Sequence, residues 1–235
     1  MSELLKLKSE IKKKSNPEKA KHSQRFFKTG PGEYSEGDIF NGLTVPECRI
    51  ISKEFKNLRT KDIQELIKSP IHEERLVALF IMVYQFEKGT PEQQKIIHEL
   101  FLKNTRYINN WDLVDLSAPK ITGAYLLNKP RKILYKLVKS KSLWERRISI
   151  ISTFTFIRHN DFTDTFEISE ILLNDKHDLI HKAVGWMLRE IGKKDRNELS
   201  NFLKTHYKKM PRTMLRYSIE HYPEEIRQKY LKGLI

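Results

Sequence analysis

The sequence has a single cysteine, little glycine or proline, and no long apolar run. Because Cys48 is the only cysteine, the chain can form neither an intrachain disulfide nor a zinc site built on several thiolates. Nine glycines, nine prolines and the lack of long alternating apolar runs favour helices over β-sheet. No apolar stretch reaches the roughly 20 residues of a membrane span, so we expect no transmembrane helix.

Targeting signals and metal-ligand patterns are also missing. The first residues lack the apolar core of a secretory signal, and their acidic residues are unlike a transit peptide. His72 precedes Glu73 and Glu74, but no second histidine stands at the spacing of a zincin helix. His177 and His181 have no evident third ligand, and we interpret them as surface residues. We therefore expect no metal, no cofactor and a cytoplasmic location.

Positive charge is in clear excess. Lys and Arg outnumber Asp and Glu by 44 to 30, which gives a net charge of +14. This excess is larger than solubility requires and indicates a polyanionic partner, most simply nucleic acid. An anionic membrane surface is the second interpretation, and a basic surface without a dedicated partner is the third. With 39% hydrophobic and 31% charged residues, the chain is typical of a folded protein.

The apolar spacing predicts helices joined by short polar connections. An amphipathic helix covers 2–14, and Asn16 with Pro17 then forms the start of a second helix that ends near Phe27. Glycines and a proline make residues 28–38 a loop, and no Gly-Lys-Ser/Thr follows to make it a Walker loop. Further helices are expected near 46–57, 60–68, 71–87, 91–105, 110–117, 119–127, 130–139, 143–158, 164–174, 178–192, 196–206, 210–221 and 223–231.

Several of these helices are similar to one another. Residues 145–150 are similar to residues 74–79 and to residues 180–185, and the last pair is separated by 35 positions. A two-helix unit of about this length is typical of HEAT-type solenoids, whose repeats bury their apolar faces only by stacking.

We therefore predict an all-α fold, a right-handed solenoid of two- and three-helix HEAT-like repeats with a concave basic face. It forms one domain over 1–235, with N-terminal helices and the Gly-rich loop in 1–44 and the repeats in 45–235. A compact irregular helical domain is the alternative.

The stretch NNWDLVD, residues 109–115, carries the first candidate site. In a helix, Trp111 and Asp115 stand four residues apart on one face, which places an aromatic surface beside a carboxylate. Asn109 or Asn110 can cap the helix start, and Asp112 suits the positive end of the helix dipole. The ordinary interpretation of each residue alone is a core tryptophan and a capping aspartate.

A second tryptophan lies on a basic helix face. The helix over 180–193 has an apolar stripe of Ile180, Ala183, Val184, Met187, Leu188 and Ile191. Trp186 falls on the opposite side with Lys182, Arg189 and Lys193. A tryptophan among cations suits stacking on bases or sugars, and packing against a neighbouring repeat is the alternative.

Three arginines complete the candidate residues. Arg147 falls inside the apolar stripe of the helix over 143–158, and a buried arginine needs an anion such as Asp115 or a DNA phosphate. Snorkelling along the apolar face is the alternative for this side chain. Arg212 and Arg216 form an i, i+4 pair that is either a solvated face or part of a basic track for a phosphate backbone.

Six segments of the chain together resemble one known family. They are NPEKA (16–20), RFFKTGPGEYSEGD (25–38), NNWDLVD (109–115), LWERR (143–147), HKAVGWMLREIGKKD (181–195) and MPRTMLRYSIE (210–220). In this order and spacing they are similar to the AlkD-like DNA alkylation repair proteins, which are bacterial DNA glycosylases built from HEAT-like repeats.

The resemblance implies cleavage of the N-glycosidic bond of cationic N3- and N7-alkylated purines, with the lesion held against a DNA-facing concave surface. Asp115 matches the family's essential carboxylate, and Trp111, Trp186 and Arg147 match the rest of its catalytic cluster. Phe26 stands where some members carry a tyrosine, so this position has no hydroxyl to offer.

The implied partner is double-stranded DNA containing alkylated bases, bound by a monomer associated with the bacterial nucleoid and needing no cofactor. A non-catalytic binder of damaged or branched DNA is the alternative, and a protein-binding HEAT scaffold is a third hypothesis that the charge disfavours. The residues expected to contact DNA are Lys28, Lys182, Arg189, Lys193, Arg212 and Arg216.

Overall fold

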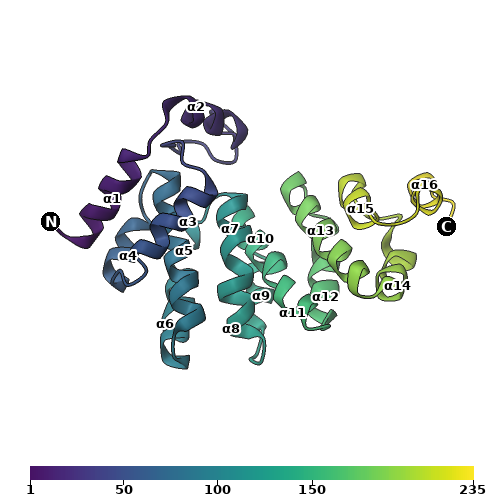
Figure 1. The fold of residues 1–235 in the computed structure, drawn as a ribbon. Coiled ribbons are helices and arrows are strands. Elements are labelled where there is room, and N and C mark those ends of the chain that lie inside the picture. The colour runs from purple at the N-terminus through teal and green to yellow at the C-terminus, as the bar shows by residue number, and fades with distance from the viewer. The chain divides into compact units, whose positions relative to one another are not determined.

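The computed structural model describes residues 1–235, and all of its regular structure is helical (Figure 1). The only β-type pairing is an isolated bridge between Ile39 and Ile71, so the all-α prediction is confirmed. Contacts within the chain gather into two compact units, named unit 1 (1–125) and unit 2 (126–235). No helix in either unit is long and apolar enough to span a bilayer.

Unit 1 begins with helices whose N-termini are capped by side chains, at α2 as the sequence predicts. Asn16 accepts a hydrogen bond at the start of α2 and Pro17 takes its first position, while Thr44 and Glu47 form a capping box at α3. The helices of unit 1 are α1 (Glu3–Lys13), α2 (Pro17–Phe26), α3 (Val45–Glu54), α4 (Thr60–Leu66), α5 (His72–Lys88), α6 (Pro91–Lys103), the 3₁₀ turn η1 (Thr105–Tyr107), α7 (Trp111–Ala118) and the π-helical turn η2 (Pro119–Gly123).

Helix α5 is the centre of unit 1. Its residues 72–83 are all buried, and it packs against α3, α4, α6 and α7. In contrast, α2 buries none of its residues and lies apart from α3–α6 (Figure 1). Gly42 allows α2 to approach the chain closely, because its φ is +84° and a Cβ there would collide with the carbonyl oxygen of Asn16. The segment after α2 is therefore held to α2 by backbone contact.

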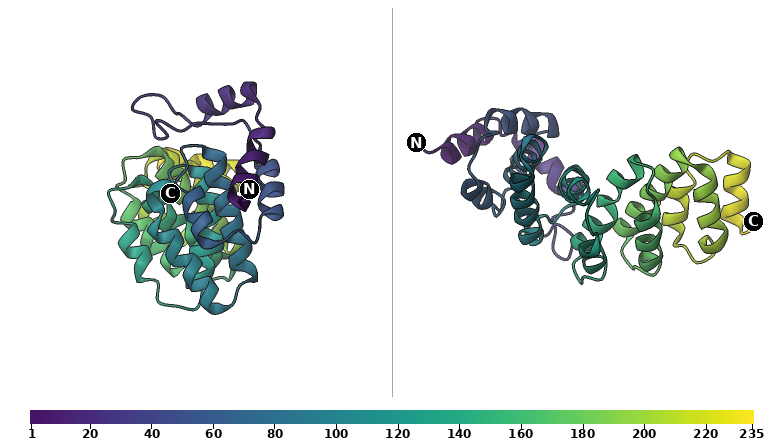
Figure 2. Two further views of the ribbon diagram at one scale, coloured as in Figure 1. Left: turned by 90° about the vertical axis from the view of Figure 1, so that its left-hand side faces the viewer. Right: turned by 90° about the horizontal axis from the view of Figure 1, so that it is seen from below.

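Unit 2 is a series of paired helices. Its helices are α9 (Lys132–Leu137), α10 (Leu143–Ser152), α11 (Phe154–Arg158), α12 (Thr163–Leu172), α13 (Asp178–Lys194), α14 (Arg196–His206), α15 (Arg212–Ser218) and α16 (Glu224–Lys232), and the short α8 (Ala124–Leu126) lies at its boundary with unit 1. Helices α10, α13 and α15 pack side by side in succession, as the green to yellow helices of Figure 2 show.

The packing of α13 confirms its predicted apolar stripe, since all six predicted residues are buried. Helices α10 and α13, which the sequence relates by the 35-residue step, pack directly against each other as successive repeats do. Gly185 lets α15 approach α13, because a Cβ there would lie 2.5 Å from Tyr217 Cβ and 2.6 Å from Met214 O. The handedness of the repeats and the concave face stay predictions.

Two expected helices depart from a regular, continuous α-helix, each for a local reason. The helix expected over 119–127 opens into the π-helical turn η2, because Pro119 has no N–H for the regular i→i−4 bond. The helix expected over 143–158 breaks at Thr153 into α10 and α11. There Ser152 Oγ donates to Ile148 O at 2.6 Å and Thr153 Oγ1 donates to Ile150 O at 2.7 Å, and such hydroxyls bend helices.

Candidate functional site

Trp111 and Asp115 lie one turn apart on α7, as predicted. The helix starts at Trp111 because Asn110 is in an extended conformation and its Oδ1 accepts a hydrogen bond from Trp111 N at 2.8 Å. Leu113 and Val114 face the core of unit 1 and are fully buried. Trp111 and Asp115 are only half-buried, so an indole and a carboxylate share a partly open helix face.

Aromatic rings from the end of α2 hold the indole of Trp111. The ring of Phe27 stacks on it at 5.2 Å between centroids, and Phe26 meets it edge-on at 5.9 Å. Phe27 also stacks on the buried ring of Phe40 at 5.1 Å. Because 57% of Phe26 is exposed, this side of the cluster presents an apolar ring to solvent beside Trp111.

A buried network of charged side chains lies at the base of this cluster. His72 Nε2 lies 2.8 Å from Asp112 Oδ2, and His72 Nδ1 lies 3.3 Å from Asp38 Oδ2. Asp38 also accepts hydrogen bonds from Arg75 at 2.6 Å and from Asn109 at 3.2 Å. Asp112 stands in the first turn of α7 as expected, but its carboxylate pairs with a histidine of α5, which the sequence did not indicate.

The charges in this network stabilise one another. Burial alone would lower the pKa of His72, but the charge of Asp112 and hydrogen bonds to Asp112 and Asp38 raise it to about 9. Burial likewise favours protonated Asp38, yet the hydrogen bond from His72 and the charges of Arg75 and His72 hold its pKa below the usual value. At neutral pH, two buried cations therefore face two buried carboxylates.

The Gly-rich loop and the segment that follows it are anchored to the same helices. The Glu73 carboxylate accepts backbone N–H groups of residues 41–43 at 2.7 to 3.1 Å. Ser35 Oγ accepts a hydrogen bond from Asn110 Nδ2 at 2.7 Å, which joins the loop to the start of α7. Lys28 is exposed at the beginning of the loop, with its Nζ 4.0 Å from the nearest Glu33 carboxylate oxygen. Its predicted contact with DNA stays a prediction.

In unit 2, Trp186 lies on the face of α13 opposite the apolar stripe, as expected. Its indole Nε1 donates to Glu190 Oε1 at 3.1 Å, and its ring lies 5.7 Å from that of Phe154. Lys193 Nζ contacts the same Glu190 oxygen at 2.7 Å, and Arg189 pairs with Glu220. The indole is half-buried, so both the predicted basic surroundings and the alternative of packing against a neighbouring helix describe part of its environment.

The other cations of unit 2 differ in burial. Arg147 is buried in α10 as expected, and its Nη1 donates to Leu179 O, at the start of α13, at 2.5 Å. Lys182 is half-buried with its Nζ 2.8 Å from Asp178, while Arg212 and Arg216 are exposed on α15. The arginine that the sequence placed in an apolar stripe thus joins α10 to the first turn of α13.

Each unit therefore carries one half of the predicted catalytic cluster. Unit 1 holds Trp111 and Asp115, and unit 2 holds Arg147 and Trp186. The convergence of the two halves on one substrate stays a prediction, and so do the roles of the six predicted DNA contacts.

Comparison with known proteins determines the family. A sequence model of the family described as DNA alkylation repair enzyme matches residues 7–222. This chain belongs to the DNA alkylation repair enzyme family. The predicted resemblance is thereby confirmed, and the family's description supports a role as an enzyme of DNA alkylation repair.

A solved structure supports the fold of this DNA alkylation repair family member. The chain is similar to a predicted DNA alkylation repair enzyme from Enterococcus faecalis, with a TM-score of 0.71 and 17% sequence identity. The match covers 89% of this chain and 97% of the other. No curated protein matches the sequence.

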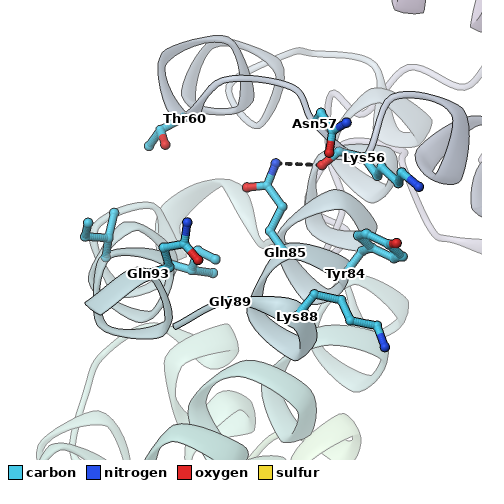
Figure 3. Close-up of a pocket in the computed structure, with 10 residues that line it drawn as sticks. Lys56, Asn57, Thr60, Tyr84, Gln85, Lys88, Gly89 and Gln93 are labelled. Atoms are coloured by element: carbon cyan, nitrogen blue, oxygen red, sulfur yellow. Dashed lines mark hydrogen bonds between the residues drawn. The ribbon is translucent and has the colours of Figure 1, made fainter. Parts of the chain in front are cut away.

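Unit 1 of this family member also has a surface cleft away from the predicted residues. Figure 3 shows it between the end of α5, the start of α4 and α6, with Gln85 Nε2 donating to Lys56 O at 2.7 Å. The cleft encloses about 360 Å³, and its lining includes Lys56, Tyr84 and Lys88 but none of the predicted site residues. No three His, Cys, Asp or Glu side chains anywhere in the chain come together as metal ligands.

Proposed function

We propose that this protein is a DNA glycosylase that excises cationic N3- and N7-alkylated purines from duplex DNA in base excision repair. The observation that carries the proposal is the half-open face of α7, where Asp115 stands one turn from Trp111. Membership in the DNA alkylation repair enzyme family supports the same class of substrate.

Asp115 is suited to the demanding part of this reaction. An N-alkylated purine carries a positive charge, so it leaves without protonation by a general acid. The C1′–N bond breaks, its electron pair stays on the purine, and positive charge develops on the sugar. A carboxylate stabilises that charge and orients the water whose oxygen bonds to C1′, and the released proton passes to the carboxylate or to solvent.

The aromatic residues supply surfaces for the damaged nucleotide. Trp111 is backed by Phe27 and flanked by the exposed ring of Phe26, so its indole is held in place without being enclosed. The hydrogen bond to Glu190 fixes the orientation of Trp186. Stacking, CH–π and cation–π contacts with these indoles then hold the cationic base and its sugar.

The basic residues provide the contacts to phosphate. The net charge of +14 supports DNA as the partner, and surface ion pairs such as Lys182–Asp178 are weak enough to exchange for phosphate. We assign Arg147 to the phosphate next to the lesion, because a guanidinium presents several donors in a planar fork that matches the geometry of a phosphate. The protein acts as a monomer in the cytoplasm in this proposal.

The test is to identify the bases that are released from methylated duplex DNA by mass spectrometry. Wild type should release N3- and N7-methylated purines, and Asp115→Asn should lower the release rate by about 100-fold or more while DNA affinity changes little. The matched control is Glu99→Gln, which neutralises an exposed carboxylate on α6 of unit 1. If wild type binds the DNA but releases no alkylated base, the non-catalytic DNA-binding alternative is correct.

A further inference from the structure

His72 joins several elements that support the candidate site of unit 1. It is the first residue of α5, and its backbone N donates to Ile39 O at 2.8 Å. Its ring reaches Asp112 in the first turn of α7 and Asp38 in the segment before α3. Two chain segments, 34 and 40 positions away from it, therefore meet at one imidazole.

The geometry favours a doubly protonated ring. Both nitrogens face carboxyl oxygens, and an ionised carboxylate only accepts hydrogen bonds, so each nitrogen carries a hydrogen when both carboxylates are ionised. The other charged group near the His72 ring is the guanidinium of Arg75, which pairs with Asp38. The buried thiol of Cys48 on α3 stays neutral, because burial and the nearby carboxylates raise its pKa.

The same ring also supports Trp111 from below. The His72 ring stacks on Phe40 with 4.5 Å between the ring centroids, and its centroid lies 5.2 Å from that of Phe27. The Phe27 ring in turn stacks on the indole of Trp111, also at 5.2 Å between centroids. The indole is thus connected to His72 twice, through the Phe27 ring and through Asp112, the residue next to it in the chain.

We propose that His72 is a positioning residue, which locks the first turn of α7 and the Phe27 ring so that Trp111 and Asp115 are held in one arrangement. Its role in catalysis rests on the proposed glycosylase function, but its role in holding Trp111 does not. Without the imidazolium, Asp38 and Asp112 lose their common donor, and the first turn of α7 loses its charged hydrogen bond to α5.

The first test reads the position of Trp111 directly. In a Trp144→Phe/Trp186→Phe background, Trp111 is the only tryptophan. His72→Gln keeps one donor and removes the charge, and we expect red-shifted Trp111 emission with about twofold or greater quenching by acrylamide. The matched control is His98→Gln, which replaces another buried histidine of unit 1 that stacks on Tyr125 outside the network. The control should leave the Trp111 signal unchanged.

The second test uses the full chain with its native tryptophans. We expect His72→Gln to slow base release at saturating DNA by about 10- to 100-fold with little change in DNA affinity, because the reacting groups are misplaced and the binding surface is intact. Asp112→Asn keeps the side-chain shape and should give a smaller loss. The double variant should be no slower than His72→Gln alone, since both changes break one contact.

The outcomes separate the two proposals. If a folded His72→Gln shows the wild-type Trp111 emission and quenching, the positioning role is wrong whatever the activity. If wild type releases no base, the glycosylase proposal fails and the fluorescence result alone decides the role of His72. If His72→Gln does not fold, as judged by circular dichroism, Asp112→Asn is measured in its place, and an unchanged Trp111 signal there overturns the proposal.

Discussion

The two units hold their charged residues in different ways. Near the predicted residues of unit 1, Asp38, His72, Arg75 and Asp112 are all buried and pair with one another. In unit 2 the pairs formed by three of the predicted DNA-contact residues lie closer to the surface: Arg189 with Glu220, Lys193 with Glu190, and Lys182 with Asp178.

This difference corresponds to two requirements of a DNA-repair enzyme, which must position its reacting side chains and also bind DNA. A buried ion pair cannot be opened without leaving a charge in a poorly solvated place, so it keeps α5, α7 and the segment before α3 in one arrangement. Surface ion pairs contribute little and exchange easily with other ions. In the proposed function, the buried network of unit 1 positions side chains, while the cations of the three surface pairs in unit 2 exchange their carboxylate partners for phosphate.

The largest expected effect tests the buried network against a surface pair. Asp38→Ala leaves Arg75 and His72 without their shared carboxylate, and we expect the free energy of unfolding to fall by about 3–5 kcal/mol. Asp178→Ala breaks the surface pair with Lys182 and should cost less than about 1 kcal/mol. Urea denaturation measures both, and equal losses would contradict the contrast between the units.

The second prediction is a pH dependence of stability caused by His72. Its pKa is raised from 6.5 to about 9 on folding, so its contribution is complete below pH 6.5 and disappears as the pH rises through about 9. The loss should be about 3 kcal/mol, from the shift between the two pKa values.

The measurement compares unfolding free energies of wild type and His72→Gln from about pH 6 to about pH 10. The difference between the two proteins should shrink along this range, because other groups titrate equally in both. A difference that stays constant with pH would show that His72 does not carry its charge in the folded protein.

The third prediction concerns the packing that stabilises unit 2. Gly185→Ala places a methyl group against Tyr217 and the backbone of Met214, and we expect a loss of about 1–3 kcal/mol because α15 has to move away from α13. The matched control is Gly192→Ala in the same helix, where the added methyl meets the flexible end of Leu199. Thermal unfolding should show a smaller change for the control, and the reverse order would contradict this account of the helix contact.

The smallest expected effect is on DNA binding by the exposed arginines. Arg212→Glu/Arg216→Glu should weaken affinity by about tenfold and reduce the slope of log K against log salt by about 2, near 0.9 per lost phosphate contact. Lys95→Glu/Lys103→Glu changes the net charge by the same amount on exposed positions of α6 and serves as control. Fluorescence anisotropy at several salt concentrations measures both, and identical slopes would remove the proposed basic track.

Much of this protein could be predicted from local sequence. Asn16 and Asn110 cap helices where short polar side chains precede apolar periodicity. The stripe on α13 followed from a spacing of 3.6 residues per turn, and Trp186 was correctly placed on its opposite face. Such features depend on residues within one or two turns, so no distant contact is needed to predict them.

The buried network could not be predicted in the same way. His72 looked like an incomplete metal motif, Asp112 like a helix-dipole residue, and Asp38 like the end of a polar loop. Their shared role depends on contacts between residues that are 34 and 40 positions apart, and the periodicity of apolar residues does not predict such long-range contacts. The one available signal was a run of four charged or titratable residues, 72–75, at the start of a helix that is then apolar over residues 76–83.

The amino-acid sequence by itself determined that this protein is helical, that it is strongly basic, and that Trp111 and Asp115 share one face of α7, because helix geometry and net charge are local or additive properties. Only the tertiary structure decided which cations are buried with partners and which stay at the surface. That choice depends on desolvation, and a side chain is desolvated by residues from elsewhere in the chain.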